Sequence, residues 1–251
     1  MHLSQRIQKI SESSCRLTED DYQLLIPHIA KLEHNMSEID ARCLIRLISN
    51  LFKGLCLEKK HEKRKIEALM RKFRDAGRRS APWRPTSSVV PGRPQDGADG
   101  NRILRWLMPT DHKFYATEVN ATLVEVKYYL QALSMTNAPA INKYDFKDIF
   151  TPWLLEHSLD EGQYLDPVQL TKIDFIEFLS EPRSVQSGHI FPLDRGGKHI
   201  PKNTFLMLFR SNQIQGNLTV KELIVLMRTI ITKHDEAEKS GNILEHIIQS
   251  G

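Results

Sequence analysis

Residues 188–216 read GHIFPLDRGGKHIPKNTFLMLFRSNQIQG, and the interpretation of the chain starts from them. The segment 184–190, which runs into this stretch, mixes apolar and polar residues in the way of a short strand. A Gly-Gly pair in the middle predicts a turn. The apolar run 204–209 is typical of a second strand, and Asn212 begins a segment with helical character. The stretch therefore predicts the order strand, loop, strand, helix.

The order and spacing of these residues resemble the HNH nucleases. The common motif of that family runs Asp-His-Ile, Pro-Leu, a Gly-Gly turn, Asn before Leu-x-x-Leu, then Cys-Asn and Lys-Gly. The matching positions in this chain are Gly188-His189-Ile190, Pro192-Leu193, Gly196-Gly197, Asn203 before Phe205-Leu206-Met207-Leu208, Ser211-Asn212 and Gln215-Gly216. The resemblance implies an α+β fold, a mainly helical protein that carries a C-terminal ββα-metal motif at 184–233.

The resemblance also implies a role for each motif residue. His189 would be the general base, a task that suits a side chain with a pKa near neutrality. Asn203 would fix the loop that carries His189 through hydrogen bonds to its backbone. Asn212 would offer a carbonyl oxygen to a divalent cation, Mg²⁺ or Mn²⁺, because hard cations choose oxygen ligands and retain several waters.

Two positions depart from the family pattern. Gly188 stands where the family has the Asp that serves as the anionic metal ligand, and Ser211 replaces the Cys. Asp194, in the same loop, is a candidate substitute ligand, and His199 is a second one. Neither of them occupies the matching position. Because a cation held by a neutral amide alone would bind weakly, the metal site is the least complete part of the motif.

Basic residues crowd another part of the chain. The net charge of +4 and the isoelectric point of about 8.9 permit a polyanionic partner without requiring one. We expect the helix predicted at 57–76 to carry the DNA-binding side chains Lys63, Arg64, Arg71 and Arg74, with Arg195 in the motif loop as a further one. Such contacts would neutralise phosphates without reading sequence. A solvated helix face is the competing interpretation.

The composition along the chain divides it into three parts. Residues 1–76 are predicted to form a helical N-terminal module. Residues 77–101 are rich in Pro, Gly, Ser and Arg without periodicity, which indicates a linker or a long irregular loop. Residues 102–251 are predicted to form the HNH-type nuclease domain.

Apolar spacing predicts the main helices and one further strand. A stripe at intervals of four residues along 39–55 and a Thr117-capped helix from 118 to 133 both indicate buried helix faces. Pro27 is expected to break or kink a helix at 17–33. Alternating apolar residues at 173–178 suggest a half-buried strand. After a capping box that begins at Thr219, a helix is expected to bury the stripe Leu223, Leu226, Met227 and Ile230.

Several classes of protein are excluded. No run approaches the roughly eighteen consecutive apolar residues of a membrane span, and the first residues lack the apolar core of a signal peptide. The three cysteines are scattered and form no CxxC pair, which argues for a reducing compartment and against a structural zinc site. We therefore expect a cytoplasmic protein.

The sequence as a whole indicates a metal-dependent HNH-type endonuclease that hydrolyses DNA, of the restriction or phage-defence kind. Gly188 keeps open the alternative of a nuclease-fold protein that binds DNA without catalysis. The apolar faces of the N-terminal helices keep open a nuclease effector that acts with a partner protein. DNA is the expected partner in each case, and a homodimer is also compatible with the sequence.

Overall fold

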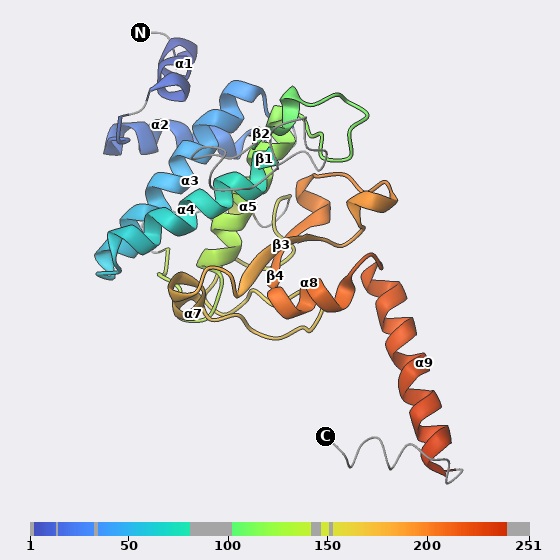
Figure 1. Cartoon of the computed structure of the whole chain (residues 1–251). Helices are drawn as coiled ribbons and strands as arrows, with labels where there is room; N and C mark the ends of the chain where they lie inside the picture. The colour runs from blue at the N-terminus through green and yellow to red at the C-terminus, as the bar shows by residue number, and fades with distance from the viewer. Residues whose placement is uncertain are drawn as a thin grey trace, which may run out of the picture.

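The computed structural model describes residues 3–13, 15–32, 35–80, 102–141, 147–150 and 153–239. These residues form an α+β structure that is mainly helical (Figure 1). The helices are α1 (Leu3–Glu12), α2 (Glu19–Ala30), α3 (Glu38–Glu58), α4 (Lys63–Gly77), α5 (Glu118–Leu133), α6 (Lys147–Phe150), α7 (Phe175–Ser180), α8 (Phe209–Gln215) and α9 (Val220–Lys239). The strands are β1 (Arg79–Ser80), β2 (Ile103–Leu104), β3 (Val185–His189) and β4 (Thr204–Leu208).

Helices α2 and α3 follow their capping signals. Thr18 and Ser37 each accept a hydrogen bond from the third residue of the helix, and that residue bonds back to the cap, which closes the boxes of α2 and α3. Pro27 does not break helix α2, which continues to Ala30. Another sequence prediction is wrong here. The helix expected at 57–76 is interrupted, because Lys60 adopts a φ of 60° between the end of α3 and the start of α4.

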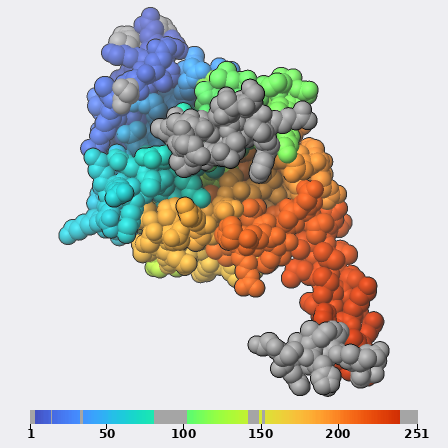
Figure 2. Space-filling model, viewed as in Figure 1, coloured from blue at the N-terminus to red at the C-terminus, as the bar shows by residue number. Residues whose placement is uncertain are grey.

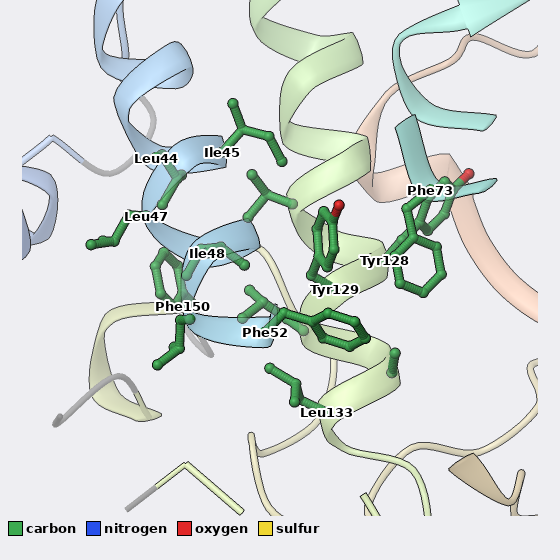
Figure 3. Close-up of a cluster of buried hydrophobic side chains, with 14 of the residues drawn as sticks. Leu44, Ile45, Leu47, Ile48, Phe52, Phe73, Tyr128, Tyr129, Leu133 and Phe150 are labelled. Atoms are coloured by element: carbon green, nitrogen blue, oxygen red, sulfur yellow. The ribbon is translucent and has the colours of Figure 1, made fainter. Parts of the chain in front are cut away.

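Helix α5 lies at the centre of the core. Nearly all of its residues are buried, because α3 and α4 pack on it from one side and β4 from another. Figure 3 shows Phe52 of α3 and Phe73 of α4 against Tyr129 of α5. The rings of Phe73 and Tyr129 meet edge to face at 4.9 Å between centroids, the arrangement that aromatic quadrupoles favour. The predicted helix at 118–133 and its Thr117 cap are confirmed.

A single hydrophobic cluster runs from α1 to β4. It includes residues on both sides of the predicted linker, so the described helices of 1–76 share their core with the rest of the chain. Strands β1 and β2 pair antiparallel, which brings Arg79 next to Leu104 across the two ends of that linker. Residues 81–101 lie outside the described residues. The division into separate modules therefore stays a prediction.

Strands β3 and β4 form an antiparallel pair directly followed by α8. In this pair His189 lies opposite Thr204, and Gly188 lies opposite Phe205. The predicted order of strand, loop, strand and helix is confirmed, and Asn212 lies within the closing helix. The strand expected at 173–178 is wrong. Those residues include helix α7, because Asp174 caps its first turn by accepting a hydrogen bond from the backbone of Glu177.

Helix α9 leaves the body of the protein at its first turn (Figure 2). The predicted capping box is present, since Thr219 and Glu222 bond to each other's backbone. The predicted buried stripe is wrong beyond Leu223: Leu226, Met227 and Ile230 are all exposed. No helix in the described part of the chain is long and apolar enough to cross a membrane. The short helix suggested beyond residue 240 lies outside the described residues.

Candidate active site

A pocket of about 500 Å³ opens beside the end of β3. Three of the residues that the sequence singled out line it: His189, Asp194 and Asn212. Arg105, which follows β2, lines it as well, although it lies far from them in the sequence. Strand β3, the following loop, α8 and the segment after β2 thus contribute to one concave site. Such a site, with convergent polar groups, is the usual place for binding or catalysis.

Asn203 holds the loop between the two strands. Its side-chain oxygen accepts a hydrogen bond from the backbone of Phe191 at 2.8 Å. Its amide nitrogen donates to the carbonyls of Phe191 and Lys198, both at 2.9 Å. These are contacts of the expected kind, but Asn203 does not line the pocket itself. The loop also needs Gly197, since a Cβ there would lie 2.2 Å from the carbonyl oxygen of Phe191.

A second histidine orients His189. Nε2 of His189 lies 3.0 Å from Nδ1 of His199, which is fully buried. Nε2 of His199 lies 2.8 Å from the carbonyl oxygen of Gly77 at the end of α4. A carbonyl can only accept, so His199 carries its proton on Nε2 and presents a bare Nδ1 when neutral. His189 must then donate from Nε2, and its own Nδ1 is left as the basic nitrogen.

This network argues against one sequence hypothesis. Both nitrogens of His199 are occupied by hydrogen bonds inside the protein, so a role as substitute metal ligand would require it to give up the bond to His189 or the bond to Gly77. His199 instead connects His189 to the C-terminal end of α4. The backbone carbonyl of His189 is held as well, because Nε2 of Gln215 donates to it at 2.8 Å.

Both histidines are neutral at physiological pH. Burial, assisted by the positive charge of Arg105, lowers the pKa of His189 to about 4. The same causes hold the pKa of His199 well below its ordinary value. A neutral His189 has a lone pair available for a proton at pH 7, which a general base requires.

Arg105 is a buried cation solvated by backbone. Its guanidinium donates to the carbonyls of Gly77 at 3.0 Å, Phe114 at 3.1 Å and Ala76 at 3.2 Å. Burial lowers its pKa to about 10, so it stays charged at pH 7. No carboxylate forms an ion pair with it among the described residues. Arginine has five N–H groups, so this side chain retains donors for an anion in the pocket.

The oxygen donors in the pocket suit a weakly held cation. Asn212 donates through its nitrogen to Gln186 at 3.0 Å, and its carbonyl oxygen is left as a potential ligand. The side-chain oxygen of Gln215 is buried without a hydrogen-bond partner. Asp194 is exposed and paired with Lys113. In the described part of the chain no three His, Cys, Asp or Glu side chains group as around a tightly bound metal. Hard oxygen donors with little charge fit Mg²⁺ that relies on water and substrate for its remaining ligands.

Packing explains why position 188 carries no side chain. A Cβ on Gly188 would lie 2.3 Å from both the sulfur and the terminal carbon of Met207, which is itself fully buried. An Asp at this position would therefore require Met207 to adopt another rotamer. The family's anionic ligand and this packing of Met207 exclude each other.

The predicted DNA-binding residues lie outside the pocket. Lys63, Arg64 and Arg71 are exposed on α4, whereas Arg74 is half-buried beside Asp75. Arg71 and Arg74 border a separate cavity of about 400 Å³ between α3, α4 and α5. Arg195 is engaged within the protein, since its guanidinium pairs with both carboxylate oxygens of Glu222. Ala76, near the end of α4, borders the pocket of His189. The basic helix therefore leads to the site.

The sequence alone did not identify Arg105 as a site residue, nor did it show that His199 orients His189. The one available signal was a charged residue inside the apolar run Ile103–Leu107, a pattern that indicates a buried and satisfied charge when it lies in a core. The contact with Gly77 could not be foreseen, because it joins residues that are far apart in the sequence.

Comparisons with known proteins give little beyond this geometry. No protein-family model matches the chain, and no curated protein matches it. Among solved structures, a crystal structure of a type II restriction endonuclease matches with a TM-score of 0.46 and 16% identity, over 72% of this chain and 80% of that chain. A likeness at this level is too low to assign a fold or a function, so what the chain does rests on its own residues.

Proposed function

We propose that this chain is a metal-dependent, HNH-type endonuclease that hydrolyses phosphodiester bonds of DNA, of the restriction or phage-defence kind. The observation that carries the proposal is the neutral His189, held by His199 with its Nδ1 unprotonated, in a pocket that it shares with Arg105 and Asn212. A neutral histidine, the positive charge of Arg105 and oxygen donors in one pocket suit the attack of water on a phosphodiester.

Each residue takes a part that follows from its contacts. His189 accepts a proton at Nδ1 as water attacks phosphorus, while the P–O bond to the sugar breaks and the leaving oxygen takes a proton from solvent. His199 keeps the imidazole oriented. Arg105 donates its remaining N–H groups to a phosphate oxygen and stabilises the charge that develops there. Substrate binding would also raise the pKa of His189 from its low value in the free protein, because a phosphate offsets the charge of Arg105.

A cation completes this scheme. Mg²⁺ or Mn²⁺, held by Asn212 with help from Gln215 or Asp194, would act as a Lewis acid on the scissile phosphate. The neutral donors available here favour a cation that binds together with the substrate.

Helix α4 supplies the proposed path for DNA. Arg64 and Arg71 are seven residues apart and thus lie on one stripe of the helix. The helix extends over about 20 Å from Lys63 to the carbonyl of Gly77, at 1.5 Å per residue. A duplex laid along this stripe would reach the pocket at the end of the helix, with phosphate contacts that position it and carry no sequence information.

One alternative has an observation in its favour. Without an anionic residue at position 188, and without a group of three His, Cys, Asp or Glu side chains among the described residues, the chain could bind DNA and not cleave it. In that case the pocket would still hold a phosphate through Arg105. The two functions predict the same binding and differ in hydrolysis.

A cleavage assay on supercoiled and linear duplex DNA decides between them. Wild type is compared with His189→Ala and with His61→Ala, which removes a histidine at the turn between α3 and α4. Without its general base the enzyme should slow by about 10²–10⁴-fold. DNA affinity should remain, since His189 contributes little to ground-state binding. His61→Ala should cleave like wild type.

The assay is repeated with Mg²⁺, Mn²⁺ and EDTA. Cleavage that survives in EDTA would refute the part assigned to the cation. Wild-type rates in His189→Ala, purified in parallel, would mean that the activity belongs to another residue or a contaminant. Binding without cleavage under every metal condition would establish the non-catalytic alternative.

A further inference from the structure

Helix α9 presents an apolar stripe that the described part of the chain leaves uncovered. Every residue from 224 to 236 is exposed, whereas Leu223 in the first turn is buried. Ile224, Met227, Ile230 and Ile231 fall within one third of the helix circumference at 100° per residue. Their side chains are 43 to 57% exposed. An apolar face of this kind on a helix that projects from the body (Figures 1 and 2) indicates an interaction surface.

The composition of the helix requires something to cover it. Seven of its residues are β-branched: Val220, Ile224, Val225, Thr229, Ile230, Ile231 and Thr232. These residues lose side-chain freedom in a helix and have modest helix propensity. Helices in proteins gain most of their stability from packing of an amphipathic face against other elements. Within the described residues the body of the protein anchors this helix at its first turn, and a helix of this sequence would not persist alone in water.

We propose that the occupant is a second copy of this chain, with the two α9 helices packed antiparallel. The charges along α9 favour this arrangement. In the first half Glu222 is already paired with Arg195, which leaves an excess of positive charge from Lys221 and Arg228. In the second half the acids Asp235, Glu236 and Glu238 outnumber Lys233 and Lys239. An antiparallel pair places each basic half against an acidic half.

The attachment of α9 supports the same geometry. The helix is fixed to the body at its N-terminal turn, through Leu223 and the pairing of Glu222 with Arg195. The remaining sixteen residues, from Ile224 to Lys239, extend about 24 Å at 1.5 Å per residue. Two such arms can cross antiparallel with their bodies at opposite ends. A parallel pair would bring both bodies to the same end and both acidic halves together.

The twofold axis of such a dimer falls near residue 229. This register follows from pairing Met227 with Ile231, which lie equally far on either side of the axis. Met227 of one copy therefore meets Ile231 of the other, and Ile224 meets His234. An interface of this type is isologous, with one patch used by both partners.

Oligomeric state in solution tests the proposal on the full chain. Light scattering and sedimentation velocity over a range of concentrations should show a dimer for the wild type. Ile231→Glu places a charge in the stripe and should give a monomer. Val225→Glu is the matched control, because Val225 is also 57% exposed and β-branched but lies on the far side of α9. That variant should remain a dimer.

A charge rescue tests the antiparallel register. Met227→Lys and Ile231→Glu should each be monomeric alone, and an equimolar mixture should recover the dimer, because residues 227 and 231 face each other only in the antiparallel pair. A monomeric wild type would overturn the proposal. So would an Ile231→Glu variant that remains a dimer, as the control Val225→Glu is expected to do. Recovery that fails in the mixture would overturn the antiparallel geometry. Circular dichroism of each variant shows whether loss of the dimer accompanies unfolding of α9 alone. None of these measurements depends on nuclease activity.

Discussion

Acidification should destabilise this protein in a pH window set by His189. The folded protein disfavours protonation of His189, because burial and the charge of Arg105 lower its pKa from 6.5 to about 4. Above pH 6.5 the side chain is neutral in both the folded and the unfolded state, so it does not change the free energy of unfolding. As the pH falls through 6.5, the unfolded chain takes up a proton that the folded protein refuses, and stability declines until the folded protein is protonated near pH 4.

The expected size of this effect follows from the shift. The full difference between 6.5 and about 4 amounts to about 3 kcal/mol, at about 1.4 kcal/mol per unit. Most of it is lost early: the same two pKa values give a loss of about 2 kcal/mol between pH 7 and pH 5. Carboxylates such as Asp40 and Glu222, whose pKa values are lowered in the folded state, lose their contribution at lower pH.

The measurement is the free energy of unfolding by urea, at pH intervals from 7 to 4.5, for wild type and His189→Gln. The glutamine amide can still donate to Nδ1 of His199 but does not titrate. Carboxylates and His199 titrate in both proteins, so they largely cancel in the comparison. The wild type should lose about 2 kcal/mol more than the variant between pH 7 and pH 5. Equal losses, or an NMR titration of His189 with a midpoint near 6.5, would refute the assigned environment and with it the neutral histidine pair.

Three further predictions concern the loop, the basic helix and the metal. Asn203→Ala should lower the free energy of unfolding by about 1–3 kcal/mol and slow DNA cleavage, whereas Lys202→Ala should change neither. If Asn203→Ala keeps full stability and the full cleavage rate, Asn203 does not hold the loop. Replacing three exposed residues of α4, Lys63, Arg64 and Arg71, by glutamine should weaken DNA binding. The slope of log affinity against log salt should decrease by about 0.9 for each phosphate contact that is lost. An unchanged slope would mean that α4 is a solvated face. Gly188→Asp should destabilise the protein by about 1–3 kcal/mol, because the new side chain collides with Met207. The double variant Gly188→Asp/Met207→Ala should bind Mg²⁺ more tightly than wild type in calorimetric titration. If it binds no more tightly than the control Gly188→Ala/Met207→Ala, the cation lies elsewhere.

The sequence by itself determined the local elements. Thr18, Ser37 and Thr117 cap helices because a side-chain oxygen meets a backbone N–H within the same turn, which needs no distant partner. Likewise the strands around the Gly-Gly turn and the position of His189 at the end of β3 depend on neighbours in the chain. The predicted strand at 173–178 failed for a related reason: a six-residue run is too short for its period to separate a strand from one helical turn, and the Asp174 cap settled the matter.

Only the tertiary structure decided the chemistry around His189. The carbonyl of Gly77 receives hydrogen bonds from both Arg105 and His199, and these residues come from three distant segments. Their meeting sets the tautomer and the low pKa of His189, and no spacing within one segment encodes it. The apolar stripe of α9 gives the converse case: periodicity marks a face that avoids water, but whether that face is covered depends on what lies beside it. For Leu223 that is the body of the protein. Beyond Leu223 the described residues leave the stripe exposed, and we propose that a second copy of the chain covers it.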